Sequence, residues 1–282
     1  MMPYLPFIIT AISTAVSAAL TGLFHRLAPA FIKLPSRHVL IEDKREKYIA
    51  YRRYLAIYTS IAHGIMCVIF SSYILCLDGI TYDEPNKRYH YILMGLSLGY
   101  YIVDSIAGFK YAFDSLTMRC HHLVMIVLLS YVIIKQRYGG IFTFFIFIGE
   151  LSNPCMHIRK NLMQFNNTKA YTDFLGIIFC ITFLICRIFG VLLVVKNIRQ
   201  STISLAFMTA LTTLWYISLE FCFTVGQFFS KGLGELGIKP CVRVYELLKS
   251  INEDRFKSIL KHIFLIGSTY GCLIGTHPKN LF

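Results

Sequence analysis

The chain has 282 residues, of which 56% are hydrophobic and only 15% are charged, and its formal net charge is +13. Soluble domains carry about a quarter charged residues, so this composition excludes a water-soluble globular fold and indicates an all-α integral membrane protein. The length suits one compact membrane domain of roughly six to eight helices, without a second globular domain.

Apolar segments near the ~20 residues that a membrane-spanning helix needs recur along the chain. We expect a first span over Leu5–Phe24. In it, two series of small residues on neighbouring faces let another helix approach closely, Ala11–Ala15–Ala19 and Ser13–Ser17. The basic connector Arg26–Arg53 follows; its two prolines should break any long helix, and it should lie on the membrane surface. Six more spans are expected at Tyr54–Leu77, Tyr89–Gly108, Arg119–Ile134, Gly139–Ile158, Thr172–Val195 and Ile203–Phe229.

These seven spans divide the chain into three parts. Residues 1–53 hold the first helix and the connector, residues 54–230 hold a six-helix core, and residues 231–282 form a tail. In the tail, apolar residues recur at helical spacing beside Lys and Arg, which is typical of amphipathic helices in the membrane interface. Its apolar end, Ile263–Gly275, is too short to span by itself and predicts either a re-entrant turn or a partner-binding segment.

The basic residues are distributed unevenly between the two sides that seven spans would create. One side receives 21 of the 28 Lys and Arg residues and the other receives six, with Arg187 inside a span. The side rich in Lys and Arg is normally cytoplasmic, or the matrix side in a mitochondrial membrane. The C-terminus should therefore face the cytoplasm or matrix and the N-terminus the opposite side. The positive charge indicates topology and contact with lipid headgroups rather than nucleic acid.

Ionisable side chains stand within these apolar segments, where such groups are rare and are functional candidates. Counted at ~1.5 Å per residue, they all lie within roughly 15 Å of the basic side. We therefore predict one cavity open toward that side, lined by His63, Tyr100, Asp104, His121, His122, Glu150, Asn153 and Glu220. The candidates for binding lipid headgroups are Arg52, Arg53, Arg159 and Lys160.

The candidate catalytic residues are His121, His122, Asp104 and Glu150. Adjacent residues point about 100° apart on a helix, so the two histidines cannot both face one small ligand. In an acyl transfer, one histidine would act as the base and Asp104 or Glu150 would orient it. Glu150 lies four residues before Pro154, and a carboxylate at this depth should pair with a His, Lys or Arg. No second histidine stands at i+4 of the pair, so we expect no metal site.

Five short motifs occur in a fixed order over residues 50–230. They are Arg52-Arg53 before Thr59-Ser60-Ile61-Ala62-His63, Gly99-Tyr100-Tyr101-Ile102-Val103-Asp104, His121-His122, Glu150-Leu151-Ser152-Asn153-Pro154 and Phe183-Leu184-Ile185-Cys186-Arg187. Together they resemble the TLC family, which groups the translocating-chain-associated membrane protein, the longevity-assurance ceramide synthases and a ceroid-lipofuscinosis protein. The resemblance implies six core helices around a lipid-sized cavity, usually with one extra N-terminal helix.

Ceramide synthases of that family transfer an acyl group from acyl-CoA to a sphingoid amine. Their His pair is followed by a His-Asp and a further Asp, which this chain does not show, so the chain resembles the non-synthase branch more closely. We expect a protein that binds lipid in its helix-bundle cavity and acts as a non-catalytic accessory subunit or adaptor of a larger organellar membrane complex. Its partners would be membrane lipids and other membrane-protein subunits, with a bound phospholipid and no cofactor.

Two alternatives are kept. An acyl-CoA-dependent lipid acyltransferase of the ceramide-synthase type would lose activity when His122 is changed, whereas a lipid holder would lose mainly stability or assembly. A lipid or cargo transporter would need a path to both faces, which the one-sided clustering of polar residues disfavours. For the location, the endoplasmic reticulum and the mitochondrial inner membrane both fit the sequence.

Overall fold

The computed structural model describes residues 4–32, 35, 41–111, 116–165 and 169–190, together with 213–214, 217–219, 221–223, 225–227, 229 and 246. In these residues every named element is a helix, and the one pairing of extended backbone is a bridge between Pro85 and Arg137. The chain divides into two compact units, residues 1–182 and 183–282, of which the first contains most of the described structure. The all-α prediction is thus confirmed.

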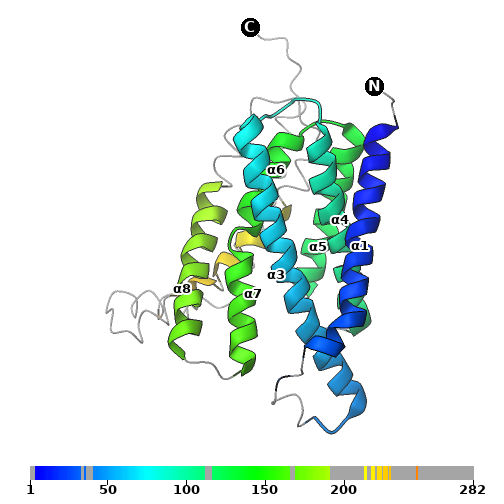
Figure 1. Ribbon diagram of the computed structural model, residues 1–282. Coiled ribbons are helices and arrows are strands. Elements are labelled where there is room, and N and C mark those ends of the chain that lie inside the picture. Colours follow the sequence, from blue (N-terminus) through cyan, green and yellow to red (C-terminus); the bar gives the residue numbers. More distant parts are fainter. Residues whose placement is uncertain are drawn as a thin grey trace. The chain divides into compact units, whose positions relative to one another are not determined.

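Among the described residues, six α-helices lie wholly within the first unit, and Figure 1 shows their arrangement. They are α1 (Leu5–Phe31), α3 (Lys44–Asp78), α4 (Arg88–Tyr111), α5 (Leu116–Lys135), α6 (Gly139–Glu150) and α7 (Asn153–Leu162). A 3-10 turn, η1 (Met163–Phe165), extends α7. The next helix, α8 (Lys169–Ile185), leads into a π-helical turn, η2 (Cys186–Gly190), in the second unit.

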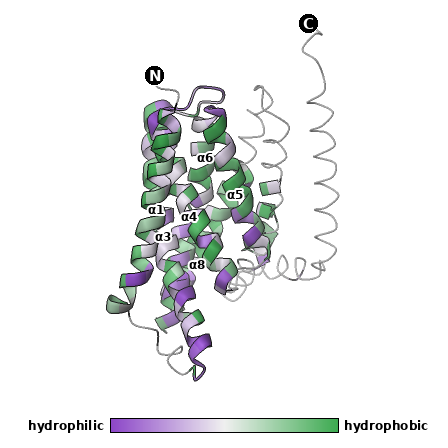
Figure 2. Ribbon diagram, turned by 90° about the vertical axis from the view of Figure 1, so that its right-hand side faces the viewer, coloured by the Kyte–Doolittle hydropathy of each residue, from purple (hydrophilic) through white to green (hydrophobic). Residues whose placement is uncertain are grey.

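Six segments of the described chain are long and apolar enough to cross a membrane. They are Leu5–Ala28, Lys44–Asp78, Arg88–Tyr111, Leu116–Lys135, Gly139–Phe165 and Tyr171–Ile188. Figure 2 shows hydrophobic residues along most of the helical length and hydrophilic residues near the helix ends. Most of the seventh predicted span, Ile203–Phe229, and nearly all of the predicted tail lie outside the described residues.

The connector predicted between the first two spans is shorter than expected, because α1 continues to Phe31 and α3 begins at Lys44. Pro29 lies inside α1, where its missing N–H leaves the carbonyl of His25 without an intrahelical donor. Arg52 of α3 supplies one, since its Nη1 donates to that carbonyl at 3.2 Å. A proline near a helix end therefore did not break the helix here, and the arginine joins α1 to α3.

The predicted span Gly139–Ile158 consists of two helices. Pro154 cannot donate a hydrogen bond to the carbonyl of Glu150, so α6 ends at Glu150 and α7 begins at Asn153. At this junction α3 approaches closely, because a Cβ on Gly64 would lie only 3.3 Å from Cδ and Cγ of Pro154. The break therefore places Glu150 and Asn153 against the middle of α3.

The first helix packs mainly against α4, and the two lie side by side in Figure 1. Two glycines of α4 make this contact possible. A Cβ on Gly95 would lie 2.7 Å from Ser13 Cβ, and a Cβ on Gly99 would lie 2.8 Å from Ser17 Cβ. Thr14 Oγ1 also donates to the carbonyl of Gly95 at 3.1 Å. Of the two predicted small-residue series, the serines make this contact, whereas the alanines Ala11, Ala15 and Ala19 are exposed.

The remaining helices of the first unit pack around α3 and α4. The long helix α3 contacts α6, α7 and α4, and α4 also packs against α5. Asn86, just before α4, joins this helix to the end of α5 and the start of α6. Its Nδ2 donates to the Val132 carbonyl (2.9 Å), and its Oδ1 accepts from Gly139 N (2.7 Å). These contacts fix the relative positions of α4, α5 and α6, which carry most of the candidate site residues.

Candidate functional site

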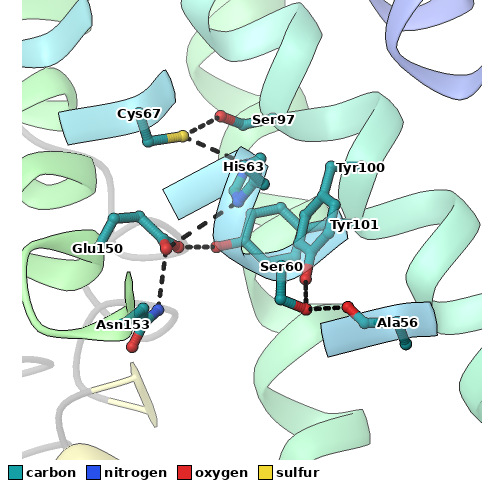
Figure 3. A network of polar contacts seen from close by, with 9 residues as sticks. All are labelled: Ala56, Ser60, His63, Cys67, Ser97, Tyr100, Tyr101, Glu150 and Asn153. Carbon is teal, nitrogen blue, oxygen red and sulfur yellow. Dashed lines mark hydrogen bonds and ion pairs between the residues drawn. The ribbon is translucent and has the colours of Figure 1, made fainter. Parts of the chain in front are cut away.

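Glu150 is the last residue of α6, and it is buried, with 7% of its surface exposed. Tyr101 of α4 donates from its hydroxyl to Oε1 at 2.9 Å, and Asn153 of α7 donates from Nδ2 to Oε2 at 2.8 Å. From α3, His63 places its Nδ1 4.0 Å from Oε2. One carboxylate thus joins side chains from three other helices (Figure 3). Such partners are what a buried carboxylate requires, because an unpaired charge costs several kcal/mol in a protein interior.

The imidazole of His63 has a partner on one ring face and a partner near each ring nitrogen, with Glu150 at Nδ1. Its ring stacks on Tyr100, with ring centroids 3.8 Å apart and an interplanar angle of 11°. Nε2 lies 3.3 Å from Cys67 Sγ, one helical turn along α3, and that thiol lies 3.4 Å from Ser97 Oγ. The orientation of His63 is therefore set by α3 and α4 themselves.

Figure 3 shows how the same two helices supply the rest of this network. The hydroxyl of Tyr100 lies 2.9 Å from Ser60 Oγ, which donates to the carbonyl of Ala56 at 2.8 Å. Residues 60, 63 and 67 of α3 recur at helical spacing, as do 97, 100, 101 and 104 of α4. The polar network therefore follows from one polar face on each of two neighbouring helices.

A second polar pair lies between α4 and α5. Nδ1 of His122 is 3.5 Å from Oδ2 of Asp104, and 6% and 12% of the two side chains are exposed. This separation fits an ion pair when the imidazole is protonated, but Nδ1 makes no hydrogen bond to the part of the chain that the structure describes. Tyr101 connects this pair to Glu150, because its ring centroid lies 5.5 Å from that of His122.

The other histidine of the pair, His121, points elsewhere, as expected for adjacent residues on a helix. Its ring centroid lies 5.8 Å from that of His122 and 6.4 Å from that of Tyr101, in an edge contact with the tyrosine. His121 is half-buried, whereas His122 is buried. The two histidines therefore share the neighbourhood of Tyr101 but differ in access to solvent.

The structure brings most of the predicted cavity residues together in the first unit. These are His63, Tyr100, Asp104, His121, His122, Glu150 and Asn153. Glu220 lies outside the described residues. Tyr101 and Cys67 were not among the predicted site residues, although Tyr101 belongs to the same motif as Tyr100 and Cys67 stands four residues after His63.

The four predicted headgroup-binding residues fall into two kinds. Arg52 donates from Nη1 to the carbonyl of His25, and Arg159 donates from Nε to the carbonyl of Thr172 at 3.0 Å. These two arginines therefore connect neighbouring helices. Arg53 and Lys160, in contrast, are exposed residues.

The carboxylates of Glu150 and Asp104 differ in their partners, and therefore in the roles they can play. Both oxygens of Glu150 accept hydrogen bonds from protein groups, which suits a structural carboxylate. The arrangement of Asp104 and His122 is the one that could orient an imidazole as a base. Within the described ranges, no group of three or more His, Cys, Asp or Glu side chains is arranged to hold a metal ion.

Comparison with known proteins gives one family and one curated relative. The family model described as "TLC domain" matches residues 58–229. Human TLC domain-containing protein 2 is 30% identical over 80 residues, which cover 28% of this chain and 30% of that protein. The match thus spans less than a third of the human protein. No solved structure matches the chain.

Proposed function

Because this chain belongs to the TLC domain family and is a polytopic membrane protein, we propose that it binds a membrane lipid in its helix bundle without transferring an acyl group itself. In this proposal the protein acts as an accessory subunit or adaptor of a membrane complex in the endoplasmic reticulum or the mitochondrial inner membrane. The bound ligand is a phospholipid, and the partners are other membrane-protein subunits.

The observation that carries the proposal is a contrast in access among the polar groups. Glu150 accepts hydrogen bonds from two protein donors and His122 is buried, whereas His121 is half-buried beside Tyr101. Asp104 lies seven residues, or about 10 Å, from the end of α4. At this depth the His121 imidazole can donate a hydrogen bond to an ester oxygen of a lipid, and the Asp104 carboxylate can accept one from a headgroup ammonium or hydroxyl group, while the acyl chains contact apolar helix faces.

The outward face of α1 supports the accessory role. It carries a continuous row of exposed apolar side chains, Ile8, Ile12, Val16, Leu20, Leu23 and Leu27. In a bilayer such a row contacts lipid tails or another transmembrane helix. The exposed Ala11, Ala15 and Ala19 lie on the same helix, and small residues allow the close approach that helix pairs in membranes use.

Lipid analysis of the purified protein tests the lipid-binding part of this proposal. We expect phospholipid at about one molecule per chain after extensive washing in mild detergent. The variant Asp104→Asn with His121→Asn should retain less, whereas Tyr73→Phe, an exposed tyrosine of α3, should retain as much as the unchanged protein. Absence of phospholipid from the unchanged protein would contradict the proposal.

The second candidate, an acyl-CoA-dependent lipid acyltransferase, is favoured by the 3.5 Å separation of Asp104 and His122. In that function the imidazole takes the proton from the acceptor amine or alcohol as it attacks the acyl thioester, and then gives that proton to the sulfur of CoA, which leaves as the free thiol when the C–S bond breaks. Asp104 holds the imidazole in place. The assay is incubation of the purified protein with acyl-CoA and a sphingoid base. Acyl transfer that disappears in a well-folded His122→Asn variant would establish the enzyme and exclude the accessory protein.

A further inference from the structure

Two tyrosines meet at the basic end of the first unit, where α3 begins and α4 ends. The hydroxyls of Tyr48 and Tyr111 are 3.5 Å apart, and their ring centroids are 5.9 Å apart at an interplanar angle of 70°. Hydroxyl pairs that satisfy each other are usually about 2.7–2.8 Å apart. The longer separation leaves both hydroxyls able to donate to a third group between them, and Tyr48 is 46% exposed.

Two cations accompany this pair of hydroxyls. Arg52 donates from Nε to the Tyr48 hydroxyl at 2.9 Å, and its guanidinium lies 4.9 Å from the centroid of the same ring. Because that hydroxyl oxygen accepts from Arg52, its own proton is directed toward another acceptor. Lys110 is exposed and places Nζ 5.6 Å from the ring centroid of Tyr111.

No carboxylate among the described residues forms an ion pair with either Arg52 or Lys110. Arg52 is instead fixed by the carbonyl of His25, a neutral partner that leaves its positive charge uncompensated. Two fixed or nearby positive charges and two hydroxyl donors are the groups that recognise a phosphate. The arrangement therefore selects an anion with several acceptor oxygens.

Tyr111 of this tyrosine pair lies on the same face of α4 as Asp104, nearer to the end of the helix. Asp104 and Tyr111 are seven residues apart on α4, which is two helical turns, so they share one face of the helix at a distance of about 10 Å. A lipid whose phosphate sat at Tyr111 would thus have its glycerol region near the depth of Asp104.

We propose that Tyr48, Arg52, Lys110 and Tyr111 bind the phosphate group of a membrane phospholipid. One phosphate oxygen accepts from both tyrosine hydroxyls, and the two cations neutralise the anion. The inference rests on the proposed lipid-binding function and names the part of the ligand that the basic end of the bundle recognises. Acyl-CoA carries phosphates of the same chemistry, so the experiment includes a lipid arm and a soluble arm.

The test uses conservative variants that keep the rings and the helix contacts. Tyr48→Phe with Tyr111→Phe removes both hydroxyls, and Lys110→Gln removes one charge. Tyr73→Phe is the control for a lost exposed hydroxyl. Lys135→Gln is the control for a lost charge, because Lys135 also lies over a tyrosine ring, 5.9 Å from that of Tyr131, but at the opposite helix end. Arg52 is left unchanged because it also anchors α1.

In the lipid arm, each protein is placed in nanodiscs of phosphatidylcholine, repurified in mild detergent after addition of phosphatidic acid, and its retained phosphatidic acid is quantified. We expect the double tyrosine variant to retain at least about tenfold less, since it loses two hydrogen bonds to a charged group, and both controls to match the unchanged protein. Equal retention by the double variant and the unchanged protein would overturn the inference.

In the soluble arm, binding of CoA is measured on the same set of proteins by microscale thermophoresis. We expect no CoA binding that depends on the two tyrosines; weakening of CoA binding alone would overturn the assignment to a lipid. If the unchanged protein retained no phospholipid at all, the proposed function would fail. Tyrosine-dependent CoA binding would then identify a soluble ligand, and the absence of both would overturn the site itself.

Discussion

At the scale of single residues, Tyr101 is the side chain that links the two polar pairs. Its hydroxyl donates to Glu150, and its ring contacts His63 and His122 from two different helices. Because Glu150 is buried, each donor that it loses leaves an acceptor without a partner in a low-dielectric environment. The stability of the contacts around Glu150 should therefore depend on the buried hydroxyl of Tyr101.

Replacement of this tyrosine tests that dependence. Tyr101→Phe keeps the ring and removes the donor to Glu150, so we expect a loss of about 1–3 kcal/mol of stability. The measurement is thermal unfolding in detergent, in which the loss of helix is monitored by circular dichroism. Tyr73→Phe, which removes an exposed hydroxyl from α3, should leave the unfolding temperature unchanged. Equal unfolding temperatures for the two variants would show that the bond to Glu150 is not important.

Residue-level contacts could be predicted from the sequence only in part. Counting residues from the basic side placed His63 and Glu150 at similar depth, because helical rise is constant. The same counting could not reveal that Tyr101 rather than Tyr100 donates to the carboxylate. That choice depends on the rotation of α4 about its axis, which is set by the packing of Gly95 and Gly99 against α1.

Among whole elements, α1 and α4 form the most extensive helix–helix contact described in the first unit. It depends on the missing side chains of Gly95 and Gly99, which let the two backbones approach. The small-residue pattern of α1 predicted such a contact from the sequence, but two faces carried the pattern equally well. The serine face packs because Thr14, on the same side, donates to the backbone of α4.

A single methyl group should disturb this contact. The Cβ of Gly99→Ala would lie 2.5 Å from the carbonyl oxygen of Thr14, so α1 has to shift outward. Overpacking of this kind costs about 1–3 kcal/mol, which should lower the unfolding temperature and increase protease cleavage after α1. The matched control is Gly22→Ala in α1, where an added Cβ meets nothing within 4 Å. Similar behaviour of the two variants would contradict the described contact.

The α6–α7 junction shows the limit of hydropathy at this scale. A continuous apolar segment predicted one helix over Gly139–Ile158, and the segment does qualify as one candidate span, Gly139–Phe165. The break arises from Pro154, which was recognised as freeing a carbonyl but not as ending a helix. Without that break, Glu150 and Asn153 would not meet at the same carboxylate.

At the scale of the whole molecule, the distribution of Lys and Arg predicts the sidedness of the protein, and two native cysteines can report it. Cys120, near the start of α5, and Cys76, near the end of α3, are both exposed and lie at opposite ends of their bundle. We expect a membrane-impermeant maleimide to label Cys120 from the cytoplasmic or matrix side and Cys76 from the other side. Peptide mass spectrometry of sealed and inverted vesicles measures both. The reverse pattern would contradict the predicted topology.

Composition alone determined the class of the molecule, because a chain with 15% charged residues has too little polar surface for water. The family was predicted from five motifs that occur in order over residues 50–230, and the family model matches residues 58–229. The organelle and the partner proteins could not be predicted from the sequence. Both depend on surfaces that other proteins recognise, and such surfaces leave no periodic pattern in the sequence. The lipid-binding role is therefore proposed from the polar side chains around Glu150 and Asp104, and the accessory role from the exposed apolar face of α1.

Native mass spectrometry after gentle detergent extraction, with lipid analysis of the same sample, distinguishes a lipid-binding accessory subunit from an acyltransferase. We expect a chain that carries a phospholipid and is isolated with stoichiometric partner subunits, whose identity also indicates the organelle. A solitary chain that carries acyl-CoA or a sphingoid base would contradict it and establish the acyltransferase instead.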